Sequence, residues 1–81
     1  MWIYCNDPKY ALNIGRAVAF KIDHAFYWET QGIKNTKGNK YVVSAYIEGE
    51  SWYICSAESE EKAEEIIMKL AKGTDEKWTI R

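Results

Sequence analysis

The chain has few of the residues from which small proteins build covalent or metal cross-links. Its 81 residues include two cysteines, Cys5 and Cys55, and a single histidine, His24. Both cysteines lie in apolar runs and not in spaced pairs, so we expect buried free thiols, with a disulfide between neighbouring strands as the alternative. One histidine and two separated cysteines do not supply the ligand spacing of a structural zinc site. We therefore expect no metal and no cofactor.

Long apolar runs and an excess of one charge are also missing. No run approaches the length that crosses a bilayer, and no basic segment followed by an apolar one marks a signal peptide, so we expect a cytoplasmic protein without a membrane partner. The 11 basic and 12 acidic residues leave a formal net charge of −1. Binders of duplex nucleic acid usually carry a clear basic excess, because neutralising phosphates supplies their affinity. The charge balance argues against that partner.

The sequence contains no familiar arrangement of catalytic residues. His24 follows Asp23 at an expected strand end, with no nucleophile motif beside it. The acidic residues over 58–65 are typical of a solvated helix face, and none stands in the contrasting environment that acid–base catalysis requires. We predict a protein that is not an enzyme and has no catalytic residue.

Aromatic residues, in contrast, are abundant. Four tryptophans, six tyrosines and two phenylalanines make up 15 % of the chain. A domain of this length is marginal in stability, and each buried aromatic ring removes a large area from water. We therefore expect a single domain over residues 1–81 that folds without a metal or a disulfide.

Alternation of apolar and polar residues predicts strands in the first part of the chain. We expect strands over 1–5, 10–14, 17–23 and 25–31, with turns at 6–8 and 13–16. Segment 10–18 also has helical spacing, so a helix beginning near Pro8 stays open there. Segment 34–40 is a polar loop.

A hairpin over 41–55 is the clearest element. A Glu48-Gly49 turn places Ala45 opposite Trp52, whereas a Gly49-Glu50 turn places Ile47 there. Both turns put the same apolar residues on one face, which we expect to be core: Val43, Ala45, Ile47, Trp52 and Ile54. The opposite face then carries Val42, Ser44, Tyr46, Tyr53 and Cys55.

An amphipathic helix follows the hairpin. Ser59 is a good N-cap, and Gly73 is the expected end. The apolar stripe consists of Ala63, Ile66, Ile67, Leu70 and Ala71. The tail over 77–81 either adds a last strand or packs Trp78 on the surface. The predicted fold class is α+β, a curved antiparallel β-meander of about five strands packed by one C-terminal amphipathic helix.

Several short patterns together resemble a known class of proteins. They are Met-Trp-Ile at 1–3, Tyr-Ala-Leu-Asn at 10–13, Phe-Lys-Ile at 20–22, the Gly-Glu hairpin at 49–50, and Ser-Glu-Glu-Lys-Ala at 59–63. The chain resembles small uncharacterised proteins of bacteria and their phages, with a β-meander, a C-terminal helix and a reduced pleckstrin-homology-like appearance. The resemblance implies this fold and no catalytic residues. It also suggests a host component as the partner.

The aromatic face of the sheet is the first candidate binding surface. Val42, Tyr46, Tyr53 and Tyr27 would form an amphipathic patch of the kind that anchors protein interfaces. We expect a protein partner there, or a second copy of the chain pairing at an exposed strand edge. The alternative is a secondary core, in which the Trp28 segment or the tail covers these tyrosines.

A lysine loop is the second candidate. Lys34, Lys37 and Lys40, with Trp28 nearby, would hold an anionic, nucleotide-like small molecule or single-stranded nucleic acid. The alternative is a solvated loop whose charges prevent association at a sheet edge.

Overall fold

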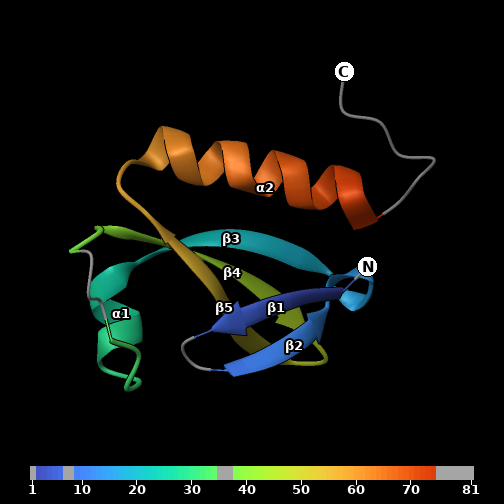
Figure 1. The fold of residues 1–81 in the computed structure, drawn as a ribbon, viewed down its shortest axis with the longest axis horizontal. Helices are drawn as coiled ribbons and strands as arrows, with labels where there is room; N and C mark the ends of the chain where they lie inside the picture. Colours follow the sequence, from blue (N-terminus) through green and yellow to red (C-terminus); the bar gives the residue numbers. More distant parts are fainter. Residues whose placement is uncertain (1, 7–8, 35–37, 75–81) are drawn as a thin grey trace.

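The computed structural model describes residues 2–6, 9–34 and 38–74. The elements are β1 (Trp2–Asn6), β2 (Lys9–Asn13), the 3₁₀ turn η1 (Ile14–Arg16), β3 (Ala19–His24), α1 (Ala25–Glu29), β4 (Tyr41–Ile47), β5 (Glu50–Ala57) and α2 (Glu60–Thr74). β1 and β2 form a two-stranded antiparallel sheet, and β3, β4 and β5 form a three-stranded one in that order (Figure 1). The antiparallel α+β class with a C-terminal helix is confirmed, but the strands divide into two sheets and do not form one meander. No helix among the described residues has the length and apolarity to cross a membrane.

The predicted strand over 25–31 is wrong, because the segment begins with α1. The Ala25 N–H donates to the Lys40 carbonyl at 2.9 Å, and one helical turn then brings Trp28 to the same side as Ala25. Both are buried, whereas Phe26 between them is 73 % exposed. The segment is helical because this conformation buries Trp28 against the sheet. The alternation of aromatic residues, which predicted a strand, does not determine the local structure.

Segment 10–18 is part strand and part 3₁₀ turn. β2 ends at Asn13, whose side chain accepts a hydrogen bond from the Gly15 N–H at 3.2 Å and so caps η1. Ile14 is completely buried. The predicted turn over 13–16 is confirmed, and the following strand begins at Ala19, two residues later than expected.

The hairpin follows the first of the two predicted registers at its turn. Glu48 and Gly49 have φ of 50° and 86°, as a type I′ turn requires, and Ala45 lies opposite Trp52. Val43 and Ala45 are fully buried, which confirms the predicted core face.

β5 contains a bulge that exchanges the faces of its second half. Val43 opposes Cys55 while Ser44 opposes Tyr53, so Ile54 is the extra residue. Beyond it, Cys55 packs in the same cluster as Val43. The predicted place of Cys55 on the opposite face is wrong, because that prediction assumed a regular pleat.

The main core lies on one face of the three-stranded sheet. α2 packs on this face with its buried Ala63, and Leu12 and Ile14 pack beside it against Phe20. Leu70 of α2 contacts both clusters, so helix and β1–β2 hairpin share a core (Figure 1).

The termini of α2 agree closely with the sequence. The Lys62 N–H donates to Ser59 Oγ at 3.2 Å, which confirms the N-cap. The helix continues to Thr74, one residue past the predicted end. The predicted positions of Trp78 and of the 77–81 tail lie outside the described residues. Cys5 and Cys55 are not joined by a disulfide; Cys5 is buried, as expected, whereas Cys55 is only half-buried.

Candidate binding site

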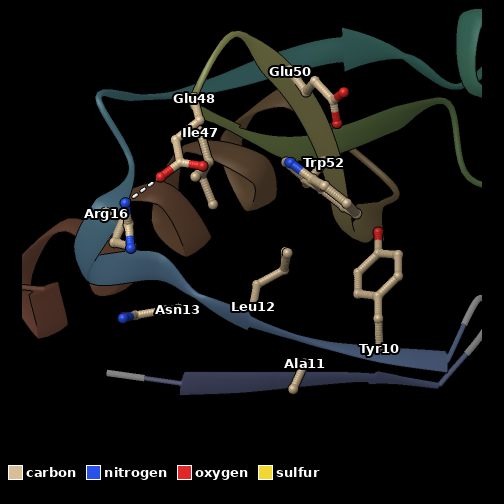
Figure 2. Close-up of a pocket in the computed structure, with 9 residues that line it drawn as sticks. All are labelled: Tyr10, Ala11, Leu12, Asn13, Arg16, Ile47, Glu48, Glu50 and Trp52. Atoms are coloured by element: carbon tan, nitrogen blue, oxygen red, sulfur yellow. Dashed lines mark hydrogen bonds and ion pairs between the residues drawn. The ribbon is translucent and has the colours of Figure 1, made fainter.

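An open cleft of about 450 Å³ separates β2 from the β4–β5 turn (Figure 2). Tyr10 and Leu12 project into it from β2, while Ile47 and Trp52 line the opposite side. The cleft lies where β2 of one sheet faces the β4–β5 turn of the other. Within the described chain, the edge of β2 that faces away from β1 pairs with no strand.

One end of the cleft is closed by polar contacts between the two sheets. The Tyr10 hydroxyl donates to the Tyr53 carbonyl at 2.5 Å, and Cys5 Sγ lies 3.5 Å from the same oxygen. Cys5 Sγ also lies 3.6 Å from the carbonyl of Ile54, the bulge residue. Side chains of the β1–β2 hairpin thus satisfy carbonyls of β5, which has only β4 as a strand neighbour in the described chain.

Burial at this end of the cleft changes the pKa of both titratable groups. Burial raises the pKa of the Cys5 thiol. Burial also raises the pKa of Tyr10, and the nearby Cys5 and Tyr53 raise it further. Both side chains are therefore protonated at neutral pH and serve as hydrogen-bond donors.

The other end of the cleft is bordered by charged side chains. Arg16 of η1 forms an ion pair with Glu48 of the turn (Figure 2). Their side chains are 64 % and 65 % exposed, so solvent screening limits the pair to about 1 kcal/mol or less. Glu50 lies closer to Trp52, which it precedes by two residues on β5 (Figure 2).

The aromatic wall of the cleft has a defined geometry. The ring centroids of Tyr10 and Trp52 lie 5.5 Å apart with planes at 89°, the edge-to-face arrangement that aromatic pairs favour. Figure 2 shows the indole between Tyr10 and Glu50. Among the described residues, neither the Trp52 indole N–H nor the Glu50 carboxylate has a hydrogen-bond or ion-pair partner.

The aromatic face predicted from the sequence is largely covered. Val42 is only 2 % exposed beneath Trp28, and the Tyr53 ring lies 5.9 Å from the Trp28 ring, half-buried. Tyr46 and Tyr27 are exposed. The structure therefore matches the secondary-core alternative for Val42 and Tyr53, and leaves only the other two tyrosines at the surface.

Trp28 is held in place by a polar cluster. Its Nε1–H donates to Asp23 Oδ2 at 2.9 Å, and Ser44 Oγ donates to the same oxygen at 2.7 Å. Trp28 is 7 % exposed and Ser44 is fully buried, so the indole has no open face on which a base could stack. Lys34 and Lys40 are exposed, and Lys37 lies outside the described residues.

Two exposed aromatic residues received no role in the sequence analysis. Trp2 and Tyr4 are 67 % and 66 % exposed on the outer face of β1, where Tyr4 pairs with Ala11. The alternation of β1 places both on one face, but only packing of the hairpin shows which face is outside.

No group of three or more His, Cys, Asp or Glu side chains in the described chain is arranged to hold a metal ion. Comparison with protein-family models, with curated proteins and with solved structures finds no match.

Proposed function

We propose that the protein is a non-catalytic interaction module that takes an extended segment of a protein partner into the cleft between β2 and the β4–β5 turn. The observation that carries this proposal is the cleft of about 450 Å³ beside an edge of β2 that pairs with no strand of the described chain, with the Tyr10–Trp52 wall within it. Extended segments gain affinity from main-chain hydrogen bonds at such an edge and specificity from pockets for their side chains.

The cleft supports binding better than the Tyr46 face. Residues that dominate binding energy are aromatic anchors in pockets from which water is excluded. Trp52 is a half-buried ring inside a cleft. The patch predicted around Tyr46 is smaller than expected, because Val42 is buried in the interior.

The cleft also supports binding better than the lysine loop. The predicted site for a nucleotide-like ligand or single-stranded nucleic acid at Lys34, Lys37 and Lys40 includes Trp28 as a stacking platform. The indole of Trp28 is buried, and its N–H is engaged with Asp23.

Selection from a displayed library of random octapeptides, followed by ¹⁵N–¹H NMR mapping on the intact chain, tests the proposal. We expect selected peptides to shift the Trp52 indole and the Leu12 amide signals. Trp52→Leu should weaken binding more than about fivefold, as truncation of an anchor does, while Tyr46→Ala leaves it unchanged.

Two results would contradict the proposal. One is a library that yields no binder. The other is a set of signal changes centred on Tyr46 and Tyr27, which would restore the face predicted from the sequence. The amide spectrum of each variant shows whether it keeps the fold.

A further inference from the structure

We infer that the segment bound in the cleft presents an arginine side chain, which stacks on the Trp52 indole and pairs with the Glu50 carboxylate. This inference rests on the proposed function, and it names the chemistry of the partner. It follows from the charge, the aromatic surface and the apolar floor of the cleft.

The charge of the cleft favours a cation. Its described charged residues are Arg16, Glu48 and Glu50. Arg16 and Glu48 are paired with each other, so their charges offset. Glu50 has no cationic partner in the described chain, which leaves one negative charge at the wall of the cleft.

The aromatic surface beside Glu50 narrows the choice of cation. Tryptophan is the ring that attracts cations most strongly, and the edge-on contact with Tyr10 fixes its orientation. A guanidinium group is planar, so it can stack on the indole and still donate two parallel hydrogen bonds to a carboxylate. A lysine ammonium lacks that planar geometry.

The floor of the cleft suits the aliphatic part of the same side chain. Leu12 and Ile47 lie on opposite sides below the rim (Figure 2). The three methylenes of arginine can pack on this surface while the charged head stays at the wetter rim. An apolar side chain in this place would cover Glu50 without pairing it, and desolvating an unpaired charge is costly.

Three capped heptapeptides of alternating threonine and valine test this inference, with arginine, leucine or glutamate at the central position. The Trp52 indole signal of the intact protein reports binding. We expect the arginine peptide to bind about fivefold more tightly than the leucine peptide, the sum of a modest ion pair and a cation–π contact. The glutamate peptide should bind most weakly.

Glu50→Gln is the decisive variant, because Glu50 is exposed and the change preserves its shape. It should remove the ion-pair part of the preference for the arginine peptide and leave the smaller part that comes from the cation–π contact with Trp52. Glu64→Gln on the exposed side of α2 changes the net charge equally and should leave the preference intact.

The outcomes separate the two proposals. Equal binding of the arginine and leucine peptides overturns the arginine inference and leaves the cleft as a peptide site. An arginine preference that Glu50→Gln does not reduce overturns the role of Glu50 and therefore the inference as stated. If none of the three peptides moves the Trp52 signal and the library also yields no binder, the proposed function fails.

Discussion

At the scale of single residues, Cys5 and Tyr10 join the two sheets. They are cross-strand neighbours in the β1–β2 pair, and both direct a polar hydrogen at the Tyr53 carbonyl. Each contact needs the protonated side chain. Because burial raises the pKa of both groups, the folded state holds these protons more tightly than the unfolded chain does.

This difference predicts a loss of stability at alkaline pH. The ordinary pKa of the thiol is 9.0, and its folded value is higher, so its contribution is complete below pH 9 and declines as pH rises toward the folded value. Tyr10 adds a second decline that begins near its ordinary value of 10.0. Urea unfolding between pH 7.5 and 10.5 should give a falling free energy of unfolding.

Variants identify the groups responsible for that decline. Cys5→Ala and Tyr10→Phe should each flatten it, whereas Tyr46→Phe, at an exposed position, keeps the slope of the unaltered protein. Equal slopes in all four proteins would show that the two buried groups do not control alkaline stability.

The polar cluster at Asp23 shows where sequence patterns stop being informative at this scale. Ser44 alternates with buried apolar residues, so the pattern predicted only that it lies on the second face of the hairpin. Ser44 donates a hydrogen bond to Asp23 of β3, and Trp28 of α1 donates another to the same carboxylate. Such a contact depends on where three elements meet, which no local spacing encodes.

At the scale of elements, the sequence predicted best where local chemistry decides. Ser59 caps α2, and Gly49 supplies the positive φ of the turn, as expected from residue type alone. α1 was mispredicted because its aromatic residues favour strands, while the tertiary contacts of Trp28 select a helical turn. The bulge at Ile54 was missed for a similar reason, since nothing in the alternation marks the extra residue.

The Gly49 turn allows a clean test of backbone preference. Its φ is 86°, and a built Cβ would meet no atom within 4 Å, so Gly49→Ala is opposed by backbone conformation alone. We expect a loss of about 1 kcal/mol in the free energy of unfolding, measured with urea.

Gly15→Ala in η1 is the matched control, since Gly15 is exposed and does not have a positive φ. It should change stability little or raise it slightly, because alanine restricts the unfolded chain. Equal losses in the two variants would contradict the assignment of the turn.

At the scale of the molecule, the two sheets share one core through Ile14, Leu12 and Leu70. The sequence predicted one domain and its main core face. It did not predict that β1 and β2 separate from the other strands, because the short segment 14–18 sets the relation of the two sheets. Trp52 packs against the shared core, as predicted, but the cleft beside it arises from that separation, so the sequence predicted no binding role for Trp52 or Glu50.

Ile14→Ala tests whether the shared core makes folding cooperative. Ile14 is completely buried, and truncation of such a residue costs about 2–5 kcal/mol. Far-ultraviolet circular dichroism and tryptophan fluorescence should still report a single transition at lower urea. Val18→Ala nearby, 75 % exposed, should change stability by less than about 0.5 kcal/mol.

Hydrogen exchange distinguishes the alternative. If Ile14→Ala removes protection from β1 and β2 while β3, β4 and β5 keep theirs, the hairpin is an independent unit and the shared core does not couple the sheets.

The bulge at Ile54 divides β5 into two segments with opposite phase. In the segment before the bulge, alternate residues face the turn and the cleft. In the segment after it, Cys55 and Ala57 face the surface beneath α2. Deleting Ile54 would therefore remove the extra residue and leave Ser56 opposite Val42 and Ala57 opposite Tyr41, each on its present face. A one-residue deletion elsewhere in β5 would keep the bulge and turn the residues beyond the deletion to the other face of the sheet. The bulge is thus the position at which β5 best tolerates the loss of one residue.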